Sequence, residues 1–412
     1  MRASSTFTPV RTMSASLLAG VEMAPRDPIL GISELFNADT NPKKANLGIG
    51  VYTDDAGKVP LLECVRRADR AILDNPAPWN YLPIDGLPAY DAAVQGLVFG
   101  ADSAVVREKR GVTVQALGGT GGLKVGADFL RRLNPEAGVW ISDPSWENHR
   151  ALFEGAGFRV ETYPYYDAAS RGVNFAAMAA ALEKLPARSI VVLHACCHNP
   201  TGYDLTPDQW VRVIEIFKAR QLVPFLDIAY QGFAEGVEPD GAAVRQFAAA
   251  CSPVFVASSF SKSFSLYGER IGALSVATAG PDEAARLLSQ LKRVVRANYS
   301  PPPTHGGKVV AMTLTTPELR TLWEKELGEM RDRIKTMRKA LVEGVQARVP
   351  GFDFGFVLRQ RGMFSYSGLT KAQVLRLREE FSIYAIETGR ICVAALNTKN
   401  VDYVADAIAK VL

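Results

Sequence analysis

The sequence predicts a mostly parallel, doubly wound α/β domain between about residues 112 and 277. Short apolar segments recur there without alternation of polar side chains, as is typical of strands buried on both faces of a sheet. Segments with helical periodicity lie between them. The expected strands are Val112–Leu117, Val139–Ser142, Val160–Tyr163, Ile190–His194, Val223–Asp227 and Val254–Ser258.

Two helices have clear start signals. Thr206-Pro207 precedes the periodic segment 208–220, because a capping threonine and a first-turn proline are typical of a helix N-terminus. Thr316-Pro317 opens a longer pattern, which we expect to run to about Arg348 and to stop at Pro350-Gly351.

Composition limits the class of protein. At 412 residues and 48% hydrophobic content, the chain is long enough to bury a large core in more than one lobe. A net charge of +4 without a basic cluster argues against a nucleic acid partner. No apolar segment approaches the roughly 20 residues that span a membrane. Five cysteines without a disulfide framework suit a reducing cytosol, so we expect a cytoplasmic protein.

The N-terminal segment is rich in serine and threonine. Residues 1–12 are basic and contain no acidic side chain, which faintly suggests a transit peptide, but the apolar segment of a secretion signal is missing. We expect a disordered extension here, with Met13 as an alternative start, within an N-terminal arm of residues 1–26.

The segment 258–270 is the most informative about function. An apolar strand leads into several serines, then Lys262, then Arg270. A lysine at a buried strand end is costly unless it is neutralised or paired, and an imine with an aldehyde neutralises it. Serine hydroxyls and an arginine suit a phosphate. An aldehyde that carries a phosphate and reacts with lysine is pyridoxal 5′-phosphate (PLP). Taken alone, such a lysine is more often an ordinary surface residue.

Two other strand ends supply the remaining parts of a PLP site. Asp227 ends one strand, and a buried carboxylate can keep the pyridine nitrogen of PLP protonated. Tyr230 follows three residues later. Asn199 lies in an Asn-Pro-Thr-Gly turn, where its amide can donate to the 3-oxygen of PLP. Taken alone, Asp227 could equally cap the next turn, and Tyr230 could be a core residue.

Two further motifs follow strands. The glycine-rich segment 118–122 opens a helix, where backbone N–H groups and the helix dipole favour a phosphate; such loops are common, and this one gains weight beside Ser259 and Arg270. The segment 194–198 contains two histidines and two adjacent cysteines. These lack the paired spacing of a zinc site, so we expect no metal.

With these motifs, the chain resembles the fold-type I PLP-dependent aminotransferases of the aspartate and aromatic amino acid branch. The resemblance runs from about Asp27 to the C-terminus. It rests on the motifs at 199–202, 227–230, 259–262 and 266–270, and segments 187–190, 227–233 and 360–366 are most similar to the bacterial tyrosine (aromatic amino acid) aminotransferases. The resemblance implies a mostly parallel seven-stranded sheet flanked by helices in a large PLP-binding domain (59–329), with a small α/β domain built from 27–58 and 330–412.

The resemblance also implies roles for individual residues. Trp146 stacks on the cofactor ring, and Tyr81 reaches the phosphate from the neighbouring subunit. Arg390 binds the α-carboxylate that all amino acids share, and Arg296, from the other subunit, binds the side-chain carboxylate of aspartate or glutamate. The implied catalytic residues are Lys262, Asp227 and Tyr230. The implied cofactor-binding residues are Gly119, Thr120, Trp146, Asn199, Asp227, Tyr230, Ser259, Ser261, Lys262, Arg270 and Tyr81, and the implied substrate-binding residues are Gly50, Trp146, Asn199, Arg296 and Arg390.

Without the resemblance, each of these side chains has an ordinary explanation. Trp146 could be a core residue, and the ring of Tyr81 could simply be buried at an interface. With 47 lysines and arginines in the chain, an arginine is most often a surface charge, so only the motif context singles out Arg296 and Arg390.

The implied activity is a two-step (ping-pong) transamination in a homodimer with shared active sites. Lys262 would take the Cα proton of tyrosine, phenylalanine, aspartate or glutamate and return it to the cofactor, and 2-oxoglutarate would accept the amino group. A dedicated aspartate aminotransferase, or a PLP lyase on the same scaffold, is the alternative, because substrate preference depends on pocket shape. A PLP-dependent transcription regulator would need a DNA-binding domain ahead of this one, which we do not expect from residues 1–26.

Overall fold

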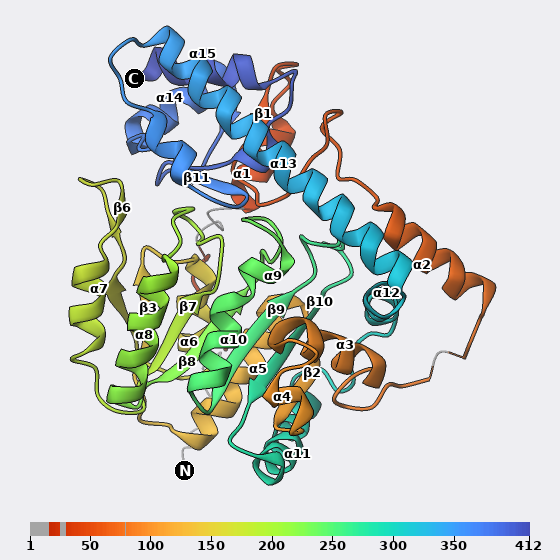
Figure 1. The fold of residues 1–412 in the computed structure, drawn as a ribbon. Coiled ribbons are helices and arrows are strands. Elements are labelled where there is room, and N and C mark those ends of the chain that lie inside the picture. Colours follow the sequence, from red (N-terminus) through yellow and green to blue (C-terminus); the bar gives the residue numbers. More distant parts are fainter. Residues whose placement is uncertain (1–15, 25–29, 79) are drawn as a thin grey trace, which may run out of the picture.

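The computed structural model describes residues 16–24, 30–78 and 80–412 (Figure 1). The predicted disordered segment 1–12 and the alternative start at Met13 lie outside the described residues. The short described segment 16–24 is exposed and contains no helix or strand.

A seven-stranded sheet lies at the centre of the larger part of the molecule, in the order β2-β10-β9-β8-β7-β3-β4 (Figure 1). β10 runs antiparallel to both of its neighbours, β2 and β9, and every other neighbouring pair in the sheet is parallel. All six predicted strands are confirmed. The seven-stranded sheet that the family resemblance implies is confirmed as well, because β10 is a seventh strand that the strand pattern does not predict. The strands are β2 (Gly111–Leu117), β3 (Val139–Asp143), β4 (Val160–Pro164), β7 (Ile190–His194), β8 (Val223–Ile228), β9 (Val254–Ser259) and β10 (Ile271–Ala277).

Helices cover both faces of this sheet, and each face has its own core. On one face, Val114, Phe225 and Leu274 pack in one cluster with Leu123 of α5 (Gly118–Leu133) and Phe153 of α6 (Glu147–Gly155). The other face packs against a larger cluster that includes residues of α3 (Pro88–Phe99), α8 (Pro207–Arg220), α10 (Ala242–Ala250) and α12 (His305–Thr315). Because both faces are covered, the strands are apolar throughout, which is the pattern that predicted them.

Both helices with predicted start signals are confirmed. In α8 (Pro207–Arg220), the side chain of Thr206 accepts a hydrogen bond from the backbone of Gln209 in a capping box. The long helix α13 (Pro317–Arg348) has Pro317 in its first turn and ends before Pro350. The other helices are α1 (Leu30–Ala38), α2 (Glu63–Asp74), α3 (Pro88–Phe99), α4 (Ala104–Arg107), α5 (Gly118–Leu133), α6 (Glu147–Gly155), α7 (Phe175–Leu182), α9 (Val237–Asp240), α10 (Ala242–Ala250), α11 (Pro281–Asn298), α12 (His305–Thr315), α14 (Lys371–Phe381) and α15 (Val401–Val411).

Segments from both ends of the sequence lie together beyond the sheet, around the C-terminal half of α13 (Figure 1). The short strand β1 (Ala45–Asn46) pairs in parallel with β12 (Ile383–Tyr384), and β11 (Phe364–Tyr366) pairs antiparallel with β13 (Arg390–Cys392). A third small pair, β5 (Tyr166–Asp167) and β6 (Gly172–Val173), forms a hairpin. Within the described parts of the chain, no helix combines the length and the apolar character needed to cross a membrane.

Candidate active site

Side chains at the carboxyl ends of the parallel strands line a cavity of about 200 Å³. The cavity lies where a doubly wound sheet binds its ligands. Ten residues with implied cofactor roles line it, together with three that the sequence had not singled out for this site, namely Leu123, His194 and Ala229. The ten are Gly119, Thr120, Trp146, Asn199, Asp227, Tyr230, Ser259, Ser261, Lys262 and Arg270.

Lys262 follows β9, and its amine lies 5.2 Å from the centre of the Tyr230 ring. Burial lowers the pKa of this amine below its ordinary value; the charge of Asp227 opposes the shift and that of Arg270 adds to it. More of the amine is therefore uncharged near neutral pH, which is the form that attacks a carbonyl.

One end of the site gathers donors for an anion. The helix α5 begins at Gly118, directly after β2, and Ser259 and Ser261 lie at the end of β9. The guanidinium of Arg270 donates to Ser261 Oγ at 3.3 Å. A Cβ atom on Gly118 would lie 2.5 Å from Arg270 Nη2, and Gly118 has φ +69°, so glycine is required for this close approach. The helix N-terminus, hydroxyls and guanidinium suit a phosphate group.

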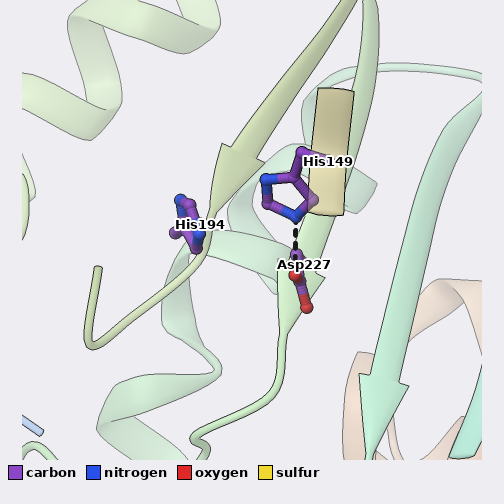
Figure 2. Close-up of side chains that lie close together, drawn as sticks. All are labelled: His149, His194 and Asp227. Carbon is purple, nitrogen blue, oxygen red and sulfur yellow. Dashed lines mark hydrogen bonds and ion pairs between the residues drawn. The ribbon is translucent and has the colours of Figure 1, made fainter. Parts of the chain in front are cut away.

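Asp227 lies at the end of β8 with its carboxylate buried. His149 Nε2 lies 2.9 Å from Asp227 Oδ2, and Figure 2 shows this contact with His194 beside it. Burial raises the pKa of Asp227, but the hydrogen bond from His149 and nearby positive charge, including that of Lys262, outweigh it, so the pKa falls below its ordinary value. Asp227 is therefore an ionised carboxylate in a buried place.

The sequence analysis missed His149. It lies on α6, three residues after Trp146, and its Nδ1 atom lies 2.9 Å from Ser145 Oγ. Burial and the neighbouring His149 lower the pKa of His194 to about 3, so the ring beside this pair is neutral. The only signal in the sequence was a histidine one turn after the tryptophan on an expected helix, which by itself points to no particular partner.

The two histidines and two cysteines of 194–198 separate into different groups. Among the described residues, two groups have ligand atoms within 4.8 Å of one another: His149, His194 and Asp227, and Cys196, Cys197 and Asp240. Hydrogen bonds account for both carboxylates, because Asp227 bonds His149 and Asp240 accepts from three backbone N–H groups. The pKa values of both thiols are raised, for Cys196 chiefly by its hydrogen bond to Cys197 and for Cys197 by burial, so both are protonated and are poor metal ligands.

Arg390 begins β13 and is 1% exposed. Its guanidinium donates to Asn199 Oδ1 at 3.1 Å and to the carbonyl of Gly48 at 2.6 Å, and it lies 4.4 Å from the centre of the Phe364 ring. Its buried Nε atom has no hydrogen-bond partner among the described residues. A Cβ atom on Gly50 would lie 2.6 Å from the Phe364 ring, so Gly50 also lies against this wall. A buried cation with an unused donor is suited to an anionic ligand.

Tyr81 and Arg296 lie away from the cavity of their own chain. Tyr81 is 90% exposed. Arg296, in the last turn of α11, is exposed and donates to Ser300 Oγ. Neither lines the cavity of Lys262. Their implied roles in a neighbouring subunit therefore stay predictions.

Comparison with known proteins identifies the class of enzyme. The family model "Aminotransferase class I and II" matches residues 42–408. The chain belongs to this family, which depends on PLP, and it is an aminotransferase.

The individual relatives given below are named either as aspartate aminotransferases or as aromatic-amino-acid aminotransferases. The chain is 63% identical to the aspartate aminotransferase of Pseudomonas aeruginosa over 96% of this chain and 100% of that protein. It is 54% identical to the aromatic-amino-acid aminotransferase of Escherichia coli over 94% of this chain and 98% of that protein. It also matches the crystal structure of the Burkholderia pseudomallei aromatic-amino-acid aminotransferase covalently bound to pyridoxal phosphate, with 66% identity, a TM-score of 0.95, and coverage of 97% of this chain and all of that one.

The residues that line the cavity fit PLP. The start of α5, the hydroxyls of Ser259 and Ser261 and the guanidinium of Arg270 match a phosphate, and the ionised Asp227 matches a protonated pyridine nitrogen. Lys262 lines the same cavity with an amine whose pKa is lowered, which matches a group that forms an imine with an aldehyde.

The hydrogen bond from His149 leads to an expectation for the pH dependence. His149→Leu leaves burial as the main influence on Asp227, so the pKa of Asp227 should rise. A protonated pyridine nitrogen requires an ionised carboxylate against it. If Asp227 supplies that carboxylate, the acid limb of the kcat/KM profile should move to higher pH, and kcat at pH 7 should fall at least about tenfold. His305→Leu, which changes a histidine that does not line the cavity, is the control.

The same pair should affect stability in acid. The ordinary pKa of Asp227 is 3.8, and its folded value is lower, so its contribution to stability is complete above the ordinary value and is lost as the pH falls through the folded value. In His149→Leu this loss should begin at higher pH in an acid unfolding titration. Coincident acid limbs for the variant and the wild type would contradict the role of His149.

Proposed function

We propose that the protein transfers amino groups from tyrosine, phenylalanine, aspartate and glutamate to 2-oxoglutarate in two half-reactions. The main support for this proposal is Arg390. Its buried guanidinium has an unpaired Nε atom and donates a hydrogen bond to Asn199, which lines the same cavity as Lys262. An α-carboxylate is the anion that all amino acid substrates share. A bidentate guanidinium placed beside an amine with a lowered pKa would hold the Cα–H bond of a substrate near that amine.

Each residue would have one role. PLP, when bound, supplies an electron sink for the electrons released at the substrate Cα. Lys262 would act first as a base, removing the Cα proton of the substrate, and then as an acid, returning that proton to the C4′ carbon of the cofactor. Asp227 would hold a proton on the pyridine nitrogen. Burial raises the pKa of Tyr230, so its hydroxyl stays protonated and would donate to the 3-oxygen together with the amide of Asn199.

Two substrate ranges are candidates for this enzyme. The aromatic-amino-acid enzymes among the relatives support activity on both classes of substrate. The Pseudomonas aeruginosa relative, which is named an aspartate aminotransferase, supports a dedicated aspartate enzyme as the second candidate. Absorbance spectra of the holoenzyme mixed with tyrosine alone, and then with aspartate alone, distinguish them, because each productive substrate converts the cofactor to its amine form.

We propose further that the protein is a homodimer in which Tyr81 and Arg296 serve the partner's cavity. Their exposure and their distance in the fold from the cavity lining support this assignment. The large (59–329) and small (27–58 with 330–412) domains are proposed with the same boundaries as above, in accordance with the pairing of β1 with β12. All five cysteines are free, which supports a cytoplasmic location.

Replacing Lys262 separates binding from chemistry. Lys262→Ala keeps the phosphate donors, so it should still bind PLP, but it lacks the group that moves the proton. Turnover should fall by several powers of ten, measured by 2-oxo acid formation. Near-normal turnover in a variant free of wild-type protein would contradict the proposed mechanism.

The two arginines should differ in what they recognise. Arg390→Ala removes the contact with the α-carboxylate. The kcat/KM value should therefore fall for every substrate, by an amount equivalent to about 2–5 kcal/mol. Arg296→Ala should damage aspartate and glutamate far more than tyrosine or phenylalanine, which have no second carboxylate. Measured kcat/KM values for all four substrates in both variants provide the test; equal losses for the four substrates in Arg296→Ala would exclude its assignment.

Mixed dimers test the shared sites. Lys262→Ala and Arg296→Asp chains should each be poor aspartate enzymes alone, the first through loss of the base and the second through charge repulsion. In a heterodimer, one site combines an intact Lys262 from one chain with an intact Arg296 from the other. Aspartate turnover should therefore return on mixing and refolding, to about half the wild-type level per heterodimer. Heterodimers that form without regaining activity would place Arg296 in its own subunit's site.

A further inference from the structure

Gln115 is a fully buried amide on β2, at the edge of the seven-stranded sheet, and it joins two separate loops. Its backbone N–H donates to the carbonyl of Asp85 at 2.7 Å, and its side-chain Oε1 accepts from the backbone of Leu87 at 3.2 Å. On the other side, its Nε2 donates to the carbonyl of Pro303 at 2.7 Å, and its backbone carbonyl accepts from the Tyr299 hydroxyl at 3.1 Å. One residue thus makes hydrogen bonds to both loops.

Both neighbouring segments approach Gln115 closely. A Cβ atom on Gly86, which has φ +120°, would lie 2.4 Å from Gln115 Cβ. A Cβ atom on Gly307 would lie 2.9 Å from Gln115 Nε2. Both contacts are shorter than a side chain allows, so Gly86 lets the first loop, and Gly307 lets the start of α12, approach the amide. A buried polar group that is hydrogen-bonded on two sides holds its partners in one arrangement.

The two loops carry the exposed residues that the proposed function assigns to the partner's cavity. The first loop, residues 81–87, begins with Tyr81 and contains both Asp85 and Leu87. The second segment, residues 296–303, begins with Arg296 in the last turn of α11, which donates to Ser300 in the loop that follows the helix, and it ends at Pro303. Gln115 contacts the middle and end of both loops but neither exposed side chain.

We propose that Gln115 is a positioning residue that fixes Tyr81 and Arg296 relative to one another, and so shapes the dicarboxylate-binding side of the partner's active site. The inference rests on the proposed shared sites. A guanidinium binds a carboxylate through two parallel hydrogen bonds, so a small displacement of the loop that carries Arg296 weakens the contact. Displacements of about 1 Å in such positions cost up to about a hundredfold.

The first test is Gln115→Leu in the full-length holoenzyme. The KM for aspartate should rise about tenfold or more, while kcat and KM for tyrosine stay within about twofold of wild type. Two measurements are independent of turnover. The dissociation constant of succinate, a dicarboxylate that cannot react, should rise in a spectral titration, and so should the dissociation constant of PLP, because Tyr81 is displaced as well. Equal changes for aspartate and tyrosine, or no change for either, would overturn the proposal.

A matched control lies two residues earlier on the same strand. Thr113 is buried on the same face of β2, and its hydroxyl shares a 2.9 Å hydrogen bond with Ser275 Oγ. Thr113→Val should lower the melting temperature without changing the ratio of aspartate to tyrosine activity. A similar change of that ratio in Thr113→Val would show that any weakening of β2 has this effect. Gln115→Met, which keeps the length of the side chain, replaces Gln115→Leu if the leucine variant does not fold.

Heterodimers show in which subunit Gln115 acts. In a dimer of Gln115→Leu with Lys262→Ala, the single competent site combines Lys262 of the first chain with the loops of the second, whose Gln115 is intact. The KM for aspartate should return to within about twofold of wild type. A KM that stays raised would overturn the inference.

The mixed dimer of Arg296→Asp and Lys262→Ala chains is measured alongside. It distinguishes a failure of this inference from a failure of the proposed function. If that pair regains aspartate turnover while the Gln115 pair keeps its raised KM, only the role of Gln115 is lost. If the Arg296 pair regains nothing, the shared sites are excluded, and the role of Gln115 in the partner's site is excluded with them.

Discussion

The ionised carboxylate of Asp227 is the constraint on which the rest of the site depends. A buried charge without a partner is costly, and the protein stabilises this one with the hydrogen bond from His149. That bond requires α6 to pack against the end of β8. The ring of His149 is held in turn by Ser145, by Trp146 at 5.3 Å between ring centres and by His194 at 4.9 Å. The charge of Asp227 therefore depends on the packing of a helix and of three aromatic or imidazole rings.

Parallel strands in register bring distant motifs together. His194 lies opposite Asp227 across β7 and β8, and Asp227 lies opposite Ala257 across β8 and β9. The turn with Asn199, the carboxylate and the segment with Lys262 therefore emerge side by side, although Asn199 and Asp227 are 28 positions apart in the sequence and Asp227 and Lys262 are 35 positions apart. This is why three short motifs were enough to indicate one site: each directly follows a strand, and parallel strands end at the same edge of the sheet.

The sequence could predict what local chemistry determines. Buried strands, the capping threonine of α8 and the glycines at the start of α5 leave signals within a few residues. Contacts between distant segments leave none. His149 resembles any helical histidine until α6 is packed, and Arg390 resembles a surface charge until β13 places it against Phe364. The sequence does not predict β10, because a parallel strand is recognised by the helical segment that precedes it. No helical segment of the described chain lies between β9 and β10.

Gln115 and Arg296 together indicate how one site could accept two classes of substrate. The segment 296–303 is fixed to Gln115 by the Tyr299 hydroxyl and by the carbonyl of Pro303, whereas the guanidinium of Arg296 is exposed and is bonded to Ser300. An exposed side chain of this kind can be moved at a cost of about 1 kcal/mol or less. Arg390 differs, because its guanidinium is buried and bonded to Asn199 and Gly48, so displacing it would break a packed wall. The arginine proposed for the α-carboxylate that all substrates share is thus held rigidly. The arginine proposed for the second carboxylate combines a fixed backbone with an exposed side chain that could move to leave space for an aromatic ring.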